Sequence, residues 1–134
     1  IMSLEVRDLD LRKMESVFKE IKKRLLSIAH DTDTKVSFDK IEIASEPAPT
    51  DLRVRKIIEA STQKLGLSYK FMPSGAGHDA QDMVHIAPTG MIFVPSKGGI
   101  SHAPQEYTKP QDMANGANVL VETILNIDKE KGES

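Results

Sequence analysis

Three of the four histidines of this 134-residue chain, and five of its eight glycines, lie between residues 73 and 107. His78 follows a turn of small residues at 74–77, and His102 follows a pair of glycines. Imidazole is the commonest metal ligand among side chains, and it can also donate a hydrogen bond to negative charge that develops during a reaction. Glycine lets a main chain approach a ligand closely. If the chain carries chemistry, we expect it in this stretch.

The apolar run at 91–94 indicates where His102 lies in the expected fold. The run is typical of a buried parallel strand, so His102 would sit on a loop at the carboxyl end of that strand, where open α/β sheets bind ligands. From position alone, a loop histidine is more often a hydrogen-bonded surface residue, and His78 is able to cap its turn and orient Asp79. One imidazole also does not hold a catalytic zinc, since such sites use about three protein ligands and a water. We expect Glu106 to bond to the backbone or to a group behind a metal ligand.

Two other sets of polar residues in this stretch are weaker candidates. Asp79, Asp82 and His85 follow one another at intervals of three. The first and last would be nearly two turns apart on a helix, which is poor geometry for zinc, so we interpret the set as structural. Ser74 and Ser101 lack a recognisable neighbouring base and a group to orient it, which disfavours a serine nucleophile.

Arg7 ends a segment in which apolar and polar side chains alternate. Met2, Leu4 and Val6 would lie on one face of the expected strand, and Arg7 on the other. A guanidinium can hold a carboxylate through two parallel hydrogen bonds. On position alone, a solvated arginine at a strand end is the simpler interpretation.

Two motifs resemble a known family. They are SGAGHDAQDM at 74–83 and MIFVPSKGGISHAPQEYT at 91–108, and a final helix is expected after them. Together they resemble the C-terminal part of the dinuclear zinc amidohydrolases, a group that contains allantoate amidohydrolase and N-carbamoyl-L-amino-acid hydrolase and is related to the zinc aminoacylases and exopeptidases. SLEVRDLD at 3–10 is similar to a strand of that family's lid domain.

The resemblance implies roles for four residues. Arg7 would bind the substrate's carboxylate, and Gly77 would let the main chain approach the substrate. His78 would hydrogen-bond the scissile amide or the tetrahedral oxyanion. His102 would complete one of two zinc sites, with manganese, cobalt or nickel as alternative metals. The implied reaction is cleavage of the carbamoyl or ureido C–N bond of N-carbamoyl amino acids or allantoate.

The family is longer than this chain, and its other metal ligands and general base lie in an N-terminal portion without a counterpart here. The resemblance therefore implies a C-terminal fragment that is inactive alone and cannot hold the metals alone. Its expected partners are the small carboxylate-bearing substrate, the missing N-terminal portion and a second copy, because the family dimerises through the lid.

The elements that position these residues are expected to form an α/β fold. Residues 1–47 predict strand, helix and strand, which is part of an α+β lid and dimerisation domain. A proline-rich hinge follows. Residues 48–134 alternate helix and strand and end in a helix after Pro110, which predicts the C-terminal part of a helix-flanked, mainly parallel catalytic sheet. Thr50 is the expected cap of the first helix after the hinge, and Gly66 its stop.

Composition excludes several other classes. The chain has no cysteine, which excludes disulfides and cysteine-ligated metals and fits a reducing compartment. A net charge of -2 without a basic cluster gives no footprint for nucleic acid. No apolar run approaches the roughly 20 residues of a membrane span, and no signal-peptide pattern opens the chain. We expect a cytoplasmic protein without membrane or nucleic-acid partners.

Three alternatives remain open at this point. The parent protein is an aminoacylase or dipeptidase of the same superfamily, or the chain is a non-catalytic module that binds carboxylates, or it is a structural remnant that binds neither metal nor ligand.

Overall fold

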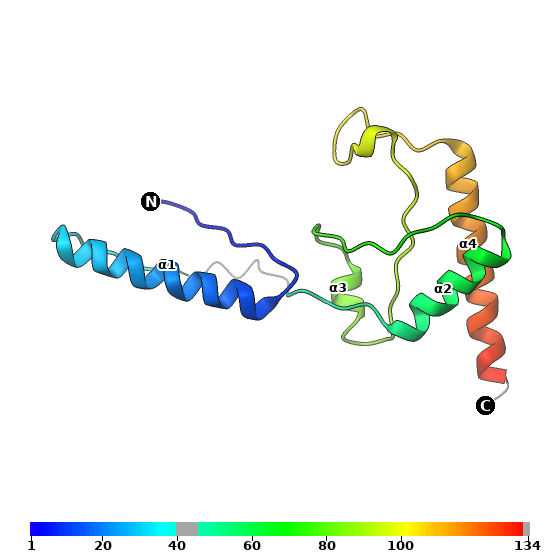
Figure 1. The fold of residues 1–134 in the computed structure, drawn as a ribbon, viewed down its shortest axis with the longest axis horizontal. Coiled ribbons are helices and arrows are strands. Elements are labelled where there is room, and N and C mark those ends of the chain that lie inside the picture. Colours follow the sequence, from blue (N-terminus) through cyan, green and yellow to red (C-terminus); the bar gives the residue numbers. More distant parts are fainter. Residues whose placement is uncertain (40–45, 133–134) are drawn as a thin grey trace. The chain divides into compact units, whose positions relative to one another are not determined.

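The computed structural model describes residues 1–39 and 46–132, and the described part of the chain is largely helical (Figure 1). Its contacts divide it into two compact units. Unit 1 is Ile1–Ala48 with Pro73–Gln81, and unit 2 is Pro49–Met72 with Asp82–Ser134. The helical elements are α1 (Leu11–Asp31), α2 (Leu52–Lys64), α3 (Ala80–Met83), the short 3-10 helix η1 (Lys97–Gly99) and α4 (Pro110–Gly132).

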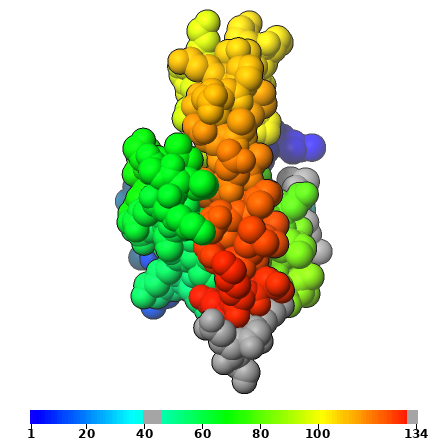
Figure 2. Space-filling view, turned by 90° about the vertical axis from the view of Figure 1, so that its right-hand side faces the viewer, coloured from blue at the N-terminus to red at the C-terminus, as the bar shows by residue number. Residues whose placement is uncertain are grey.

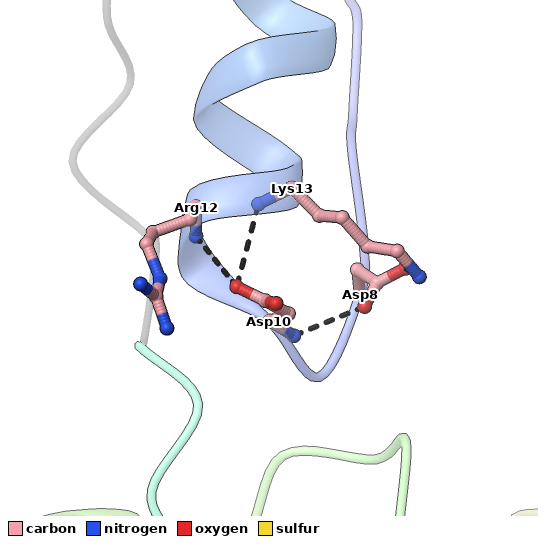
Figure 3. A network of polar contacts seen from close by, with 4 residues as sticks. All are labelled: Asp8, Asp10, Arg12 and Lys13. Carbon is pink, nitrogen blue, oxygen red and sulfur yellow. Dashed lines mark hydrogen bonds and ion pairs between the residues drawn. The ribbon is translucent and has the colours of Figure 1, made fainter.

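Helix α1 begins at a network of polar contacts directly after Arg7 (Figure 3). Asp10 caps the helix, because its Oδ1 accepts from the backbone N–H groups of Arg12 at 2.9 Å and Lys13 at 3.4 Å. The N–H of Asp10 in turn donates to Asp8 Oδ1 at 3.0 Å, and Lys13 Nζ lies 3.4 Å from Asp8 Oδ2. That N–H, with the charge of Lys13, lowers the pKa of the Asp8 carboxyl. The turn that follows Arg7 is thus fixed by bonds within five residues.

Most of the apolar side chains of α1 are exposed. Of the residues of this helix only Ala29 is buried, and Phe18 keeps 44% of its surface accessible. After α1 the chain returns along the helix: Thr34 N–H donates to Ala29 O at 2.8 Å, and Lys22 Nζ lies 5.3 Å from the centre of the Phe38 ring. Helix α1 therefore forms, but most of its apolar side chains are left exposed instead of being packed against another element.

In unit 2, α2 packs along α4 (Figure 2). Val54 and Ile57 of α2 and Val119 of α4 are buried. Ser61 and Thr123 are also buried, and Thr123 satisfies its hydroxyl by donating to Val119 O at 2.7 Å. The interface is thus apolar with a few paired hydroxyl groups, which is the condition for burying polar atoms at low cost.

The ends of α2 are set by local chemistry. Its N-cap is Asp51 and not Thr50, because Asp51 Oδ1 accepts the N–H of Val54 at 2.9 Å. The expectation for Thr50 was wrong by one residue, since both types are good caps and only the contact with the third helical residue decides between them. Gly66 follows the C-cap with φ of +67°, as predicted for the glycine that ends this helix.

Within residues 1–39 and 46–132 no β-strand is assigned. The segments expected as strands at 2–7, 67–72 and 91–94 are irregular chain, and the one at 36–43 extends into residues outside the described ones. A strand is defined by hydrogen bonds to a neighbouring strand. The α/β class, the parallel sheet and the assignment of 1–47 and 48–134 to two domains therefore stay predictions.

Residues 90–94 nevertheless pack closely on both helices of unit 2. A Cβ at Gly90 would lie 2.6 Å from Val54 Cγ1 of α2, and one at Gly116 of α4 would overlap Val94 Cγ1. A larger residue at either position would force these side chains to shift. Beside this contact lies an open groove of about 490 Å³. Its lining includes Ile58, Ile92, Val94, Leu120 and Ile124.

Candidate active-site residues

His78 lies in unit 1, in a loop whose main chain is held from both sides. Its N–H donates to Gln81 Oε1 at 3.1 Å, and its carbonyl accepts the N–H of Gln81 at 2.8 Å. Gln81 Nε2 donates to Glu46 O at 2.9 Å, which ties the loop to the proline-rich segment that precedes α2. The half-buried His78 ring is bonded through Nε2 to Ser74 Oγ at 2.7 Å.

Gln81 is a site residue that the motif analysis missed. It stands three residues after His78 and reaches back to that residue's N–H, as the glutamine of a capping box does at the start of a helix. The signal that could have identified Gln81 is its position three residues after His78, a loop residue that precedes α3.

The same loop corrects the expectation for Ser74. We expected no base beside this hydroxyl, yet Ser74 Oγ lies 2.7 Å from a ring nitrogen of His78. The two residues are four apart in a non-helical segment, where the direction of a side chain does not follow from spacing. The Ser74–His78 pair is therefore a finding of the structure.

The glycines of this turn have ordinary backbone geometry. Neither Gly75 nor Gly77 has a positive φ. A Cβ at Gly77 would meet Gln81 Oε1 at 3.5 Å, which is a normal contact, and one at Gly75 would meet nothing within 4 Å. The backbone of this loop does not by itself require glycine, so the role of Gly77 in approaching a substrate stays a prediction.

Arg7 belongs to the same unit as His78. Its side chain is 72% exposed and its Nε is bonded to Glu5 Oε1, so the two terminal nitrogens of the guanidinium are not used in that ion pair. Exposed pairs of this kind contribute about 0–1 kcal/mol to stability and exchange readily for another carboxylate. The geometry is compatible with the expected role of Arg7.

His102 lies in unit 2 on a loop that spans residues 96–107. The loop is closed where Lys97 N–H donates to Tyr107 O at 2.8 Å. Glu106 Oε2 accepts the N–H of His102 at 2.8 Å, and Glu106 N–H donates to Ala103 O at 2.9 Å. The expected bond from Glu106 to the backbone is thus confirmed.

The backbone of this loop turns through left-handed conformations three times. Gly98 and Gly99 have φ of +66° and +68°, as glycines readily do, but His102 itself has φ of +56°. That conformation costs a histidine free energy, and such residues gather at functional sites. Its bond to Glu106 holds the main chain there, and its side chain is exposed.

His102 is the metal-ligand candidate of unit 2. Nowhere in the described ranges do three or more histidine, aspartate or glutamate side chains gather as a metal site would require. His102 offers one exposed imidazole of the right chemical type, so it fits as one ligand of a metal site that needs further ligands.

Within the described ranges, no helix has the length and the hydropathy to cross a membrane.

Comparison with known proteins identifies a family and several relatives. Residues 7–126 match peptidase family M20/M25/M40. Ureidoglycolate hydrolase of Arabidopsis thaliana is 41% identical over 127 residues, which are 94% of this chain and 26% of that protein. N-carbamoyl-L-amino acid amidohydrolase of Geobacillus stearothermophilus is 33% identical over 92% of this chain and 30% of its own length. Allantoate amidohydrolase of Escherichia coli K12 is 31% identical over 88% of this chain and 28% of its own length.

Solved structures agree with this grouping. The chain superposes on AtUAH in complex with (S)-hydroxyglycine with a TM-score of 0.73 and 41% identity, over 87% of this chain and 27% of that one. It also superposes on an amidase of the hydantoinase/carbamoylase family from Burkholderia multivorans with a TM-score of 0.75 and 28% identity, over 89% of this chain and 29% of that one. The chain thus spans between a quarter and a third of the length of the relatives and solved structures named here.

Proposed function

Since the chain belongs to peptidase family M20/M25/M40, we propose that it is part of a metal-dependent amidohydrolase that cleaves the carbamoyl or ureido C–N bond of a small carboxylate. The observation that carries this proposal is the 41% identity to a ureidoglycolate hydrolase along 94% of the chain. The names of two further relatives refer to N-carbamoyl-L-amino acids and allantoate. All these substrates join a carbamoyl or ureido group to a carboxylate.

Arg7 binds the carboxylate of the substrate in this proposal. Support comes from its exposed guanidinium, which pairs with the carboxylate of Glu5. A planar guanidinium receives a carboxylate through two parallel hydrogen bonds, which also fixes its orientation. Orientation is what brings the ureido group to the reacting groups in a productive geometry.

His78 donates a hydrogen bond to the carbonyl oxygen of the scissile bond. The bond strengthens as that oxygen becomes negative, and donors of this kind contribute about 10²–10³-fold to the rate. Support comes from the fixed main chain of its loop, because a donor that needs no reorganisation is the effective one.

His102 is one ligand of a metal ion, with zinc as the first candidate and manganese, cobalt or nickel as alternatives. When bound, such a metal supplies Lewis acidity toward the carbonyl oxygen and the attacking water. The chain covers 26–30% of the three named relatives, so the other ligands and the general base are proposed to lie in the part that it does not cover. The 134 residues alone are then inactive.

The proposal also includes a homodimer, which light scattering tests, and a cytoplasmic location, which cell fractionation tests.

A panel of substrates tests this function. The complete polypeptide that contains this chain is loaded with zinc or manganese and assayed for ammonia released from ureidoglycolate, allantoate and N-carbamoyl amino acids. Activity on at least one of these, absent from the isolated 134-residue chain, is the expected result. Activity confined to N-acetyl amino acids or dipeptides, which release no ammonia, would replace the proposal by an aminoacylase or dipeptidase. Carboxylate binding in calorimetry without any hydrolysis would indicate a binding module.

A further inference from the structure

We propose that Gln81 is a positioning residue for His78, because its carboxamide ties the main chain of His78 to the carbonyl group of Glu46. The inference rests on the proposed function, in which His78 donates a hydrogen bond at the reacting carbonyl. Two bonds of the carboxamide prompt it: His78 N–H donates to Gln81 Oε1 at 3.1 Å, and Gln81 Nε2 donates to Glu46 O at 2.9 Å. All three residues belong to unit 1.

The two partners fix the orientation of the Gln81 carboxamide. A main-chain N–H group is only a donor, so His78 N–H requires the oxygen of the carboxamide. A main-chain carbonyl is only an acceptor, so Glu46 O requires the nitrogen. This carboxamide bridge therefore needs an acceptor and a donor on one planar group, which glutamine supplies. A glutamate would place a second acceptor against Glu46 O, and a methionine has neither a comparable acceptor nor a donor.

One end of the carboxamide bridge holds the backbone of His78. Gln81 N–H also donates to His78 O at 2.8 Å, so His78 is bonded to Gln81 through both its N–H and its C=O groups. A Cβ at Gly77 would lie 3.5 Å from Gln81 Oε1, so the carboxamide also lies beside the residue that precedes His78. The backbone of His78 sets the direction of its Cα–Cβ bond, and this direction sets the region that the imidazole reaches.

The other end of the carboxamide bridge is a stiff anchor. Glu46 precedes Pro47, and a proline restricts the residue before it to extended conformations. Gln81 and Glu46 are 35 positions apart in the sequence, so their bond joins the His78 loop to a distant segment of unit 1. A residue that only caps α3 would need the bond to His78 N–H and no second bond. The bond to Glu46 is therefore the feature that indicates positioning, because an effective donor is held in place before the substrate arrives.

The test compares variants of the complete polypeptide that contains this chain. Gln81→Met keeps the approximate volume of the side chain and loses both bonds of the carboxamide. Gln81→Glu keeps an acceptor for His78 N–H and loses the donor to Glu46 O. Gln111→Glu is the matched control, because Gln111 is an exposed glutamine of α4 in unit 2. Circular dichroism and thermal unfolding check that each variant is folded.

Steady-state kinetics use the ureido substrate with the highest kcat/KM in the panel above. We expect Gln81→Met to lower kcat by about 10- to 100-fold with little change in KM, because a misplaced donor weakens the transition state more than substrate binding. The kcat of Gln81→Glu should lie between those of Gln81→Met and the parent, and Gln111→Glu should match the parent. His78→Ala removes the donor itself and should cost about 10²–10³-fold.

Hydrogen exchange measures the bond at His78 N–H without turnover. In protein labelled with ¹⁵N-histidine, the main-chain amide signal of residue 78 is identified by its loss in His78→Asn. We expect this amide to exchange about fivefold faster in Gln81→Met than in the parent, which corresponds to one lost hydrogen bond. The exchange in Gln81→Glu should be slower than in Gln81→Met, because the acceptor is kept.

The outcomes separate this inference from the function on which it rests. If His78→Ala loses activity while Gln81→Met keeps the kcat of the parent, the role of Gln81 is refuted and the proposed function stands. A lower melting temperature of Gln81→Met with an unchanged kcat would likewise reduce Gln81 to a helix cap. If Gln81→Glu has the kcat of the parent, the bond to Glu46 does not position His78 and the carboxamide bridge is refuted. If His78→Ala is as active as the parent with an unchanged circular dichroism spectrum, the proposed role of His78 fails, and this inference fails with it.

Discussion

Asn126 Nδ2 of α4 donates a hydrogen bond of 3.0 Å to Oγ of Ser61, a residue of α2 with no exposed surface. The two bonded residues are 65 positions apart in the sequence, so the bond joins two helices that are distant along the chain. Apolar side chains such as Ile57 and Val119 give the interface most of its favourable energy, but the bond fixes its register.

Removing the hydroxyl at position 61 is expected to destabilise unit 2. Ser61→Ala leaves Asn126 without this partner, which we expect to cost about 1 kcal/mol of unfolding free energy. Urea denaturation measures it, with Ser68→Ala as an exposed serine control. Asn126→Ala and the double variant complete a cycle, and a coupling energy near zero would show that the bond contributes nothing.

Gly116 provides a prediction whose sign opposes helix propensity. Replacing an interior helical glycine by alanine normally stabilises by about 0.5–1 kcal/mol. Here the added Cβ would overlap Val94 Cγ1, so we expect Gly116→Ala to lower the unfolding free energy. Removing that methyl with Val94→Ala should make Gly116→Ala less harmful than it is in the parent.

The control for this prediction is Gly75→Ala, because a Cβ there meets no atom within 4 Å. Thermal unfolding followed by circular dichroism compares the variants. Equal melting temperatures for Gly116→Ala and the parent would show that residues 91–94 do not pack on α4 as described.

Local signals in the sequence explain what could be predicted of this fold. Gly66 at the end of α2 acts through its own backbone conformation and Pro110 at the start of α4 through its fixed φ, and both helices occur where they were expected. The cap of α2 was missed by one residue because Thr50 and Asp51 are adjacent and both are residue types that cap helices.

The candidate site was predictable only in part. The glycine pair before His102 indicated a loop after the apolar run, and the structure adds that both glycines have left-handed conformations in that loop. The positive φ of His102 itself could not be predicted, because histidine adopts this conformation more often than most residue types but still in a small minority of cases. The Ser74–His78 bond depends on the side-chain torsions of both residues in a loop. The expected sheet depends on hydrogen bonds to neighbouring strands, which the periodicity of one segment does not supply.

Asp8 gives the start of α1 a defined response to pH. The Asp10 N–H and then Lys13 lower the pKa of Asp8 in the folded protein below its ordinary 3.8. A carboxyl with a depressed folded pKa contributes stability above its unfolded pKa and loses that contribution as the pH falls through the folded value. Asp8→Asn should therefore destabilise the protein at pH 7, and the difference should vanish in acid below the folded pKa.

An NMR titration of the Asp8 carboxyl checks the cause of this shift. We expect a midpoint below 3.8 in the parent. Lys13→Met should raise it because it removes the nearby charge, whereas Lys19→Met on the same helix should leave it in place. A midpoint unaffected by Lys13→Met would mean that the Asp10 N–H acts without help from the ion pair.

The substitution chosen at His102 decides whether a loss of activity reports on the ring or on the backbone. Alanine removes the imidazole but is also strained at φ of +56°, whereas asparagine tolerates this conformation. We expect His102→Asn in the complete polypeptide to bind less metal and to lose at least about 10²-fold in kcat/KM, while its melting temperature without metal stays close to that of the parent. Elemental analysis of dialysed protein, together with kinetics, measures both quantities.

Glu106→Gln keeps an oxygen for the His102 N–H and should retain the metal, whereas Glu106→Ala should loosen the loop and weaken metal binding. Full metal content in His102→Asn would show that this imidazole is not a ligand, and the left-handed turn at residue 102 would then need another explanation.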